Sequence, residues 1–322
     1  MRAIIHERFG PPDVLELREI ERTPLTDDGV LVRVHASSVN PLDWHYLTGT
    51  PYLVRIDAGL RRPKTRRLGT DFAGTVEAAG KDVTDFQPGD EVFGARNGAY
   101  GEYVCVRRSI ARKPANVSFE DAAASPIAGI TALQGLINKG GIQAGQKVLI
   151  NGASGGVGTF AVQIAKSVGA EVTGVCSTRN VDMVRSIGAD RVIDYTQEDF
   201  TRNAERYDLL LDIAGNHPWR EIKRVLREDG TSVVVGGPKT NRWVGSFGRS
   251  IVERLISIPD SRTLVTPFIA NLTREDLTAL GELLEAGKVK PVIERQYELR
   301  DVPEALGYLG TGHVQGKLVV MV

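Results

Sequence analysis

The fold of this chain is decided by one stretch, Lys147-Val148-Leu149-Ile150-Asn151-Gly152-Ala153-Ser154-Gly155-Gly156-Val157-Gly158, and by the apolar helical pattern of residues 159–168 that follows it. The stretch predicts a strand, a glycine-rich turn and a helix. Small residues let the backbone approach an anion closely, and the free N–H groups at a helix start supply positive potential. We therefore expect the turn, with Ser154, Gly155 and Gly156, to hold the diphosphate of a dinucleotide.

The glycine pattern alone is weak evidence. Ala153 stands where the first glycine of the dinucleotide-binding fingerprint is expected, and Gly155 and Gly158 fill the other two places. The residues that follow strengthen the prediction, since they indicate strands at 171–177, 191–195 and 208–213 and a helix at 181–187. This alternation favours a dinucleotide-binding domain over an ordinary turn in an unrelated α/β protein.

The end of the second strand selects the dinucleotide. Enzymes that use NAD usually place an acidic residue there, but this chain has Cys176-Ser177-Thr178-Arg179. We expect that no carboxylate repels a 2′-phosphate, that Ser177 and Thr178 donate hydrogen bonds to it, and that Arg179 pairs with it. The sequence therefore predicts NADP(H) rather than NAD(H). The alternative is that Arg179 is a solvated side chain on a surface turn.

Composition limits the function classes. The 322 residues are 42% hydrophobic and 25% charged, and 40 basic side chains balance 40 acidic ones, so we expect no binding of nucleic acid. The two cysteines, Cys105 and Cys176, form no spaced cluster, which favours a reducing compartment. The N-terminus lacks the apolar core of a signal peptide, and no apolar run approaches a membrane span. We expect a cytoplasmic protein.

The chain changes character along its length. Short β-like runs dominate the first part, at residues 2–6, 14–20, 30–39, 72–79, 91–93 and 101–106, and resemble a small barrel. Ser118 is a candidate N-cap for helical periodicity over 122–137. Further helices are expected near 218–227, at 273–286 and at 303–309, with strands at 231–235, 291–299 and 317–322. The final strand is expected to rejoin the first domain.

Two other segments have alternative interpretations. Residues 243–258 carry apolar side chains on one helix face, which favours packing in a core or between subunits over a role at a membrane surface or over the substrate. A basic stretch contains Arg55, Arg61, Arg62, Lys64, Arg66 and Arg67. A solvated loop is the favoured interpretation, and attraction of an anionic cofactor or partner is the alternative.

Several short blocks together resemble the medium-chain dehydrogenase/reductases, specifically their zinc-free quinone oxidoreductase branch. The blocks are Ser38-Val39-Asn40-Pro41-Leu42-Asp43, Gly69-Thr70-Asp71-Phe72-Ala73-Gly74, residues 86–94, residues 129–133, the glycine-rich turn, residues 188–195 and Gly316-Lys317. The resemblance implies an α/β chain with a GroES-like β-barrel domain, residues 1–124 and 268–322, and a Rossmann doubly wound parallel-sheet domain, residues 125–267. It also implies a nicotinamide lying in the cleft between the two domains, and a homodimer.

The resemblance further implies where the cofactor lies. Asn40 and Thr131 would sit beside the nicotinamide, and Val157 under the diphosphate. The adenosine 2′-phosphate would be surrounded by Ser177, Thr178, Arg179 and Tyr195. The remaining groove would be lined near Ile213, Gly236 and Phe268, with Lys317 as a weaker candidate. Each of these residues has a purely structural alternative as a turn or cap residue.

The chemistry expected is hydride transfer without a metal. Zinc alcohol dehydrogenases of this superfamily need a Cys and His ligand set, but where they carry Gly-His-Glu this chain has Gly69-Thr70-Asp71, and its five histidines are scattered. An acceptor that already delocalises charge is then required, so quinones and α,β-unsaturated carbonyls are the expected substrates.

The proton donor stays open. His45, Tyr46, Tyr52 and bound water are the candidates, all following the candidate catalytic residue Asn40. An NADPH-binding structural or regulatory protein with little turnover is the alternative function. A zinc-dependent alcohol dehydrogenase is a more remote alternative.

Overall fold

The computed structural model describes residues 1–237, 257, 261–266 and 268–322. The chain divides into two compact units. The first unit contains residues 1–130, 271–287 and 291–322, and the second contains residues 131–270 and 288–290. The first division falls after Ile130, inside a helix, rather than after residue 124 as we expected from the sequence.

The first unit is built on a seven-stranded sheet. Its order is β14-β15-β3-β4-β5-β7, with β6 also paired to β3, and only the β14–β15 pair is parallel. The strands β1 and β2 form a separate antiparallel pair. The bounds are β1 (Arg2–Ile5), β2 (Glu16–Glu19), β3 (Val30–Val39), β4 (Asp71–Ala79), β5 (Glu91–Ala95), β6 (Tyr103–Val106), β7 (Ile110–Arg112), β14 (Ile293–Glu298) and β15 (Lys317–Met321).

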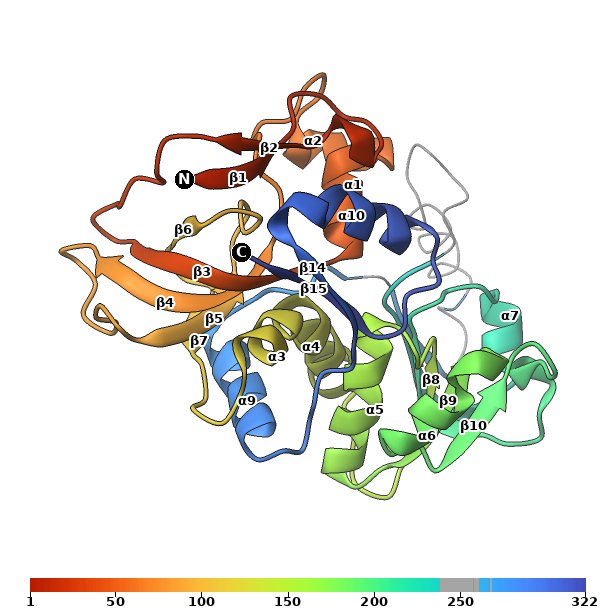
Figure 1. Cartoon of the computed structure of the whole chain (residues 1–322). Coiled ribbons are helices and arrows are strands. Elements are labelled where there is room, and N and C mark those ends of the chain that lie inside the picture. The colour runs from red at the N-terminus through yellow and green to blue at the C-terminus, as the bar shows by residue number, and fades with distance from the viewer. Residues whose placement is uncertain (238–256, 258–260, 267) are drawn as a thin grey trace. The chain divides into compact units, whose positions relative to one another are not determined.

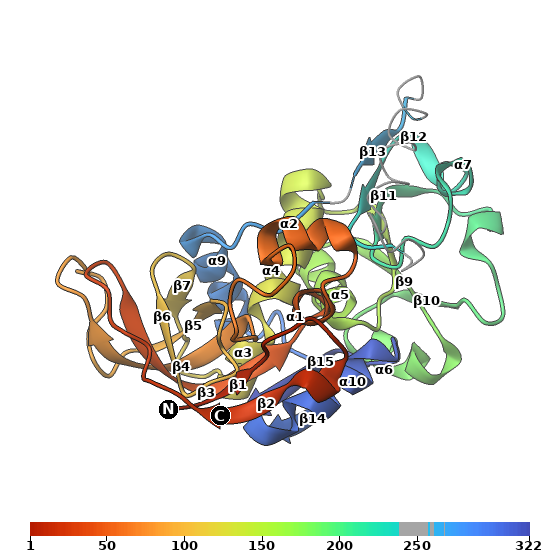
Figure 2. The same ribbon diagram turned by 90° about the horizontal axis from the view of Figure 1, so that it is seen from above.

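The helices of this unit pack on the sheet and on one another. They are α1 (Pro41–Thr48), α2 (Arg55–Ala58), α3 (Phe119–Ala124), the first residues of α4 (Pro126–Leu133), α9 (Arg274–Glu285) and α10 (Val302–Gly310). Helix α1 lies beside α10, and α9 lies beside β7, as Figures 1 and 2 show. The expected N-cap is confirmed, since the Ser118 side chain accepts from Asp121 N at the start of α3.

The C-terminal strand rejoins the first unit, as the sequence predicts. Strand β15 pairs antiparallel with β3, so that Leu318 lies opposite Val39. Its apolar side chains Leu318 and Val320 enter a buried cluster that also contains Leu47 of α1 and Leu306 of α10. Burial of these apolar side chains stabilises the packing of β15 against α1 and α10.

The described residues of the second unit form a six-stranded parallel sheet. Its order is β10-β9-β8-β11-β12-β13, so the chain reverses direction across the sheet between β8 and β11. The bounds are β8 (Lys147–Asn151), β9 (Glu171–Cys176), β10 (Arg191–Asp194), β11 (Tyr207–Asp212), β12 (Leu226–Val234) and β13 (Thr263–Val265). Ligands of such sheets bind outside the carboxyl ends of the strands, at this reversal point.

The helices of the second unit connect these strands. They include α5 (Gly156–Val168), α6 (Val181–Ser186) and α7 (Trp219–Ile222). The middle of α5, residues 158–165, is buried on all sides, and Gly169 ends the helix in the left-handed conformation. Parallel strands joined by such helices confirm the doubly wound prediction.

Two helix predictions are wrong in extent. The pattern over 122–137 is divided into α3, α4 and a π-helical turn, Gln134–Lys139, because Pro126 has no N–H to continue the hydrogen-bond ladder. The helix expected near 218–227 is confined to α7, and Leu226 already pairs with Tyr207 in the sheet. Apart from residue 257, the segment 243–258 lies outside the described residues.

Candidate active site

A tight turn connects β8 to α5. Gly152 has a φ of +92°, a conformation that other residues rarely adopt, and the N–H groups of Gly152 and Ala153 both donate to Val175 O, at 3.1 and 3.0 Å. Ala153 is fully buried and has no positive φ. The turn therefore needs its glycine at position 152, which explains why Ala153 is tolerated where the fingerprint has glycine.

The absence of a side chain has a different reason at Gly158 than at Gly155. A Cβ on Gly158 would lie 2.1 Å from Gly152 O, so the fold itself requires glycine there. A Cβ on Gly155 would meet only Gly152 O, at 3.7 Å, so the protein leaves that space open. Gly155 is also the N-cap of α5 and supplies no capping side chain, with Gly156 and Val157 as the first helical residues. This open, uncapped helix start fits the diphosphate of a dinucleotide.

The side chain of Asn180 links the turn to the end of β9. Its Nδ2 donates to Ser154 Oγ at 3.0 Å and to Ser177 Oγ at 3.2 Å, and the residue is buried. Ser154 and Ser177, both predicted site residues, are therefore brought together. The sequence analysis did not select Asn180, although it directly follows the Ser177–Arg179 stretch.

A carboxylate lies beside this stretch, contrary to our expectation. Thr178 Oγ1 donates to Asp194 Oδ2 at 2.6 Å, and Asp194 is the last residue of the neighbouring strand β10. The hydrogen bond from Thr178 lowers the pKa of Asp194, so the carboxylate is ionised at neutral pH. The Thr178 hydroxyl proton is therefore committed to Asp194. The stretch 176–179 itself holds no carboxylate, and Asp194 is brought beside position 178 only by sheet pairing, in which it lies opposite Cys176.

The other predicted residues of the second unit lie at its strand ends and helices. Tyr195 is exposed directly after β10. Ile213 and Gly236 follow β11 and β12 and lie against each other, because a Cβ on Gly236 would be 2.4 Å from Ile213 O. Phe268 lies near Lys139, whose Nζ is 6.0 Å from the ring centroid, and Thr131 is buried in α4.

The first unit contains a buried polar cluster centred on Asn40. Lys317 Nζ donates to Asn40 Oδ1 at 2.6 Å, and Asn40 Nδ2 donates to Asp71 Oδ2 at 2.9 Å. The same Asp71 oxygen accepts from Ser38 Oγ at 2.9 Å, and Asp71 Oδ1 accepts from Ile127 N at 3.1 Å. The structure thus brings together Asn40 and Lys317, which are 277 residues apart in sequence.

Burial controls the pKa values of the charged pair in this cluster. It raises the pKa of Asp71 above its usual value, although the Lys317 charge and the hydrogen bonds from Asn40 and Ser38 act in the opposite direction. It lowers the pKa of Lys317, against the attraction of Asp71. Two charges that lose their hydration need each other and their hydrogen-bond partners.

Asp43 forms the adjoining half of the cluster. Its carboxylate accepts from Asn40 N at 2.8 Å, from Thr70 Oγ1 at 2.9 Å and from Tyr100 OH at 3.1 Å. Burial, partly offset by these hydrogen bonds, raises the pKa of Asp43 to about 6. Asp43 and Asp71 lie within the family blocks, but we predicted no role for either residue. In the sequence, Asn40 lies shortly before Asp43, and Thr70 lies directly before Asp71. This pairing of polar residues with carboxylates was the signal from which the cluster could have been predicted.

The three candidate proton donors have separate partners. His45 Nδ1 lies 2.6 Å from Thr50 O, and Tyr52 lies under the Arg55 guanidinium, 4.8 Å from its Cζ. Tyr46 OH donates to Asp57 Oδ2 at 2.5 Å. Burial and this contact raise the pKa of Tyr46 to about 12.

Within the described residues, no three His, Cys, Asp or Glu side chains come together in a way that could hold a metal ion. In this same part of the chain, no helix is long and apolar enough to cross a bilayer.

Comparison with known proteins agrees with this architecture. Residues 26–115 match the alcohol dehydrogenase GroES-like domain, and residues 187–320 match a zinc-binding dehydrogenase family. A 2-methylene-furan-3-one reductase from Solanum lycopersicum is 33% identical, over 99% of this chain and 79% of the relative.

Solved structures cover the whole chain. The quinone oxidoreductase from Coxiella burnetii has a TM-score of 0.87 at 32% identity and covers 100% of this chain and 99% of its own. The Escherichia coli quinone oxidoreductase complexed with NADPH has a TM-score of 0.82 at 25% identity, with 100% of both chains covered. The expected pairing of a GroES-like domain with a Rossmann domain is confirmed. This chain belongs to the medium-chain dehydrogenase/reductase superfamily, in its quinone oxidoreductase-like branch.

Proposed function

We propose that this oxidoreductase uses NADPH to reduce quinones or α,β-unsaturated carbonyls, and that it does so without zinc. The observation that carries the proposal is the turn from β8 to α5, where Gly155 leaves an open face at an uncapped helix start. NADPH, when bound, supplies the hydride. The residues of this chain have to bind it, orient it and keep water from the reacting atoms.

The preference for NADPH depends on the end of β9. Arg179 is exposed in the 3₁₀ turn Thr178–Asn180, and a guanidinium there would pair with a 2′-phosphate. The Asp194 carboxylate acts against this preference, since it is ionised and holds the Thr178 hydroxyl. We propose that the charge of Arg179, with Ser177 and Tyr195 beside it, outweighs that of Asp194.

The substrate class follows from the donor set. Thr70 and Asp71 stand where zinc-dependent relatives carry histidine and glutamate, and both are engaged in the buried cluster of the first unit. Without a Lewis acid, the acceptor must delocalise the incoming charge through its own conjugation. Support comes from the tomato relative, whose name specifies a conjugated methylene ketone, and from the Coxiella quinone oxidoreductase.

The roles of the remaining residues are also proposals. Asn40 and Thr131 would contact the nicotinamide, and Lys317 would act through Asn40, whose oxygen it holds. Val157 would lie under the diphosphate, while Ile213, Gly236 and Phe268 would line the rest of the cofactor groove. The cytoplasmic location and the homodimer stay predictions, and sedimentation of the purified protein tests the second.

Cofactor affinity is the direct test of this function. We expect the dissociation constant for NADPH to be lower than that for NADH. Arg179→Ala should weaken NADPH by about 10-fold or more and leave NADH within about twofold, since a charge-assisted contact is lost for only one ligand. Arg202→Ala, an exposed arginine of the same unit, is the matched control. A tighter NADH complex in the wild type would contradict the proposal.

Turnover separates the two function classes. Loss of NADPH absorbance with a small quinone or an alkenal, in protein treated with a chelator, supports a zinc-independent reductase. Tight NADPH binding without turnover of either class would instead assign a structural or regulatory role. Activity that requires stoichiometric zinc would refute the metal-free mechanism.

A further inference from the structure

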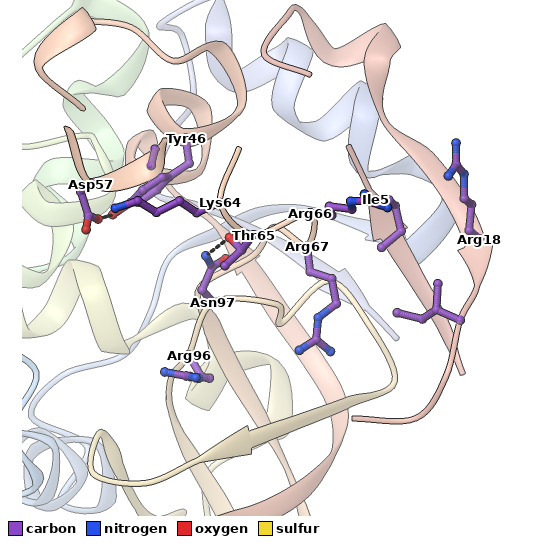
Figure 3. Close-up of a pocket in the computed structure, with 12 residues that line it drawn as sticks. Ile5, Arg18, Tyr46, Asp57, Lys64, Thr65, Arg66, Arg67, Arg96 and Asn97 are labelled. Atoms are coloured by element: carbon purple, nitrogen blue, oxygen red, sulfur yellow. Dashed lines mark hydrogen bonds between the residues drawn. The ribbon is translucent and has the colours of Figure 1, made fainter. Parts of the chain in front are cut away.

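A cavity of about 710 Å³ is lined entirely by residues of the first unit. Its walls come from β1 and β2, from α1 and α2, and from the loops that follow α2 and β5. They carry Ile5, Arg18, Ile20, Tyr46, Asp57, Ala58, Lys64, Thr65, Arg66, Arg67, Arg96 and Asn97 (Figure 3). A volume of this size suits a small organic ligand.

The cavity is strongly basic in a chain whose total charge is balanced. Five of its lining residues are Arg or Lys, and Asp57 is the only acidic one. The Asp57 carboxylate accepts the Tyr46 hydroxyl. Such a concentration of like charge on a concave surface favours an anionic ligand.

Three of these cations have no carboxylate partner among the described residues. Arg67 donates to Thr23 Oγ1 at 2.6 Å, and Lys64 Nζ lies 3.3 Å from Ile56 O. Arg96 is held by its backbone, whose N–H donates to Thr70 O at 2.7 Å, while its guanidinium makes no hydrogen bond or ion pair within the described part of the chain. By contrast, Arg18 pairs with Glu7 at 2.9 Å and with Glu16 at 2.7 Å. The cavity thus keeps three positive groups that a ligand can neutralise.

Arg67 and Arg96 also repel each other. Burial and the nearby Arg96 charge both lower the pKa of Arg67. Arg67 is partly buried and Arg96 is exposed, so the repulsion acts on a guanidinium that has lost part of its hydration, and an anion bound between the two groups relieves it.

The backbone holds this arrangement in place. His6 N donates to Arg66 O at 2.8 Å, and Ile5 bridges to Arg67, so the loop after α2 is fixed to β1. Gly98 lies against the Arg67 guanidinium, because a Cβ there would be 3.2 Å from Arg67 Cζ. The backbone of Arg66 and Arg67 is therefore fixed to β1, while the side chains of Lys64 and Arg66 are exposed, in agreement with the solvated loop favoured from the sequence.

The remaining walls indicate the rest of the ligand. Ile5, Ile20 and Ala58 provide an apolar surface, and Asn97 Nδ2 donates to Thr65 Oγ1 at 2.8 Å beside the cations. A ligand with one compact, multiply charged end and a small apolar body satisfies both parts. Arginine pairs recognise phosphate well, since the guanidinium fork matches two of its oxygens.

We propose that this cavity is a binding site for a small organic phosphate monoester, with Arg67, Arg96 and Lys64 around the phosphate and the apolar body against Ile5 and Ile20. No residue of the glycine-rich turn lines this cavity, and the proposal does not depend on the NADPH-dependent reduction.

Calorimetric titration with phenyl phosphate tests the site. We expect Arg96→Glu to weaken binding by about 10-fold or more, because the charge at the phosphate is reversed. Arg107→Glu is the control, since Arg107 is exposed, belongs to the same unit and pairs with Asp28 outside the cavity. It should bind within about twofold of the wild type. Neutral benzyl alcohol should not bind, and inorganic phosphate should bind more weakly than phenyl phosphate.

Each opposite result overturns the proposal. These results are an absence of phenyl phosphate binding in the wild type, equal weakening by Arg96→Glu and Arg107→Glu, and inorganic phosphate binding as tightly as the ester. Loss of binding in Arg179→Ala would assign the ligand to the cofactor cradle instead. Unchanged melting temperatures of the variants exclude unfolding as the cause, and Arg96→Gln replaces Arg96→Glu if that variant does not fold.

Discussion

The Lys317 ammonium lies 3.8 Å from the Asp71 carboxylate, and both side chains are almost completely buried. Asn40 bridges them, accepting from Lys317 Nζ and donating to Asp71 Oδ2. The pair joins β15, near the end of the chain, to β4 in the first part of the sequence. A charged pair at this depth is stable only with both partners present.

Removal of one partner should therefore be costly. We expect Lys317→Met to lower the free energy of unfolding by about 3–5 kcal/mol, since the Asp71 carboxylate is left buried without its counter-charge. The double variant Lys317→Met with Asp71→Asn should recover part of this loss. Urea unfolding followed by circular dichroism measures both values. A loss below about 1 kcal/mol in the single variant would show that the pair behaves like an exposed one.

Asp43 should make stability depend on pH between its unfolded and folded pKa values, 3.8 and about 6. In this window the folded protein binds more protons than the unfolded chain, so stability falls as the pH rises. Because the shift is about two pKa units, we expect the wild type to lose about 3 kcal/mol from pH 3.8 to pH 7 relative to Asp43→Asn. Parallel curves of unfolding free energy against pH would contradict the shift.

The two glycines of the turn should respond differently to alanine. Gly155→Ala meets only open space, so we expect a melting temperature close to that of the wild type but a dissociation constant for NADPH raised about 10-fold, because the methyl group blocks the approach of the diphosphate. Gly158→Ala is the comparison, since its Cβ would lie 2.1 Å from Gly152 O and should destabilise the fold itself. An unchanged dissociation constant for NADPH in Gly155→Ala would show that this turn does not bind the diphosphate.

Tyr46 is a poor proton donor as the structure places it. Its hydroxyl already donates to Asp57, and its pKa of about 12 is far from a working pH near neutrality. We expect Tyr46→Phe to change kcat for a quinone by less than about threefold, whereas loss of a general acid typically costs about 100-fold or more. Steady-state kinetics across a pH series provides the measurement. A 100-fold loss with an altered pH profile would make Tyr46 the donor.

Sequence reasoning succeeded where the chemistry is local. The turn between β8 and α5 follows from small residues between a buried strand and a helix, and the N-cap at Ser118 follows from a hydroxyl before acidic residues. Even the substitution at Ala153 is explained locally, because Gly152 takes the positive φ. These features depend on neighbours in the chain, and neighbours are what a sequence displays.

Sequence reasoning failed where partners are distant or a single residue interrupts a pattern. Pro126 divided the helix expected over 122–137, since periodicity does not register a missing N–H. Asp194 reached Thr178 through parallel strand pairing. Three residues of the basic stretch, Lys64, Arg66 and Arg67, line a cavity whose other walls include β1 and the loop after β5.

The sequence by itself determined the alternation of strands and helices over residues 147–213, the glycine-rich turn and the family blocks, because propensity, capping and glycine geometry act over a few residues. Only the tertiary structure decided which polar groups share a buried environment. The Asn40, Asp71 and Lys317 cluster, the Asp194 carboxylate beside Thr178, and the uncompensated charge of Arg67 and Arg96 all arise from long-range contacts. Burial then strengthens electrostatic interactions and shifts pKa values. These effects exist only in the folded chain, because burial itself is a product of folding.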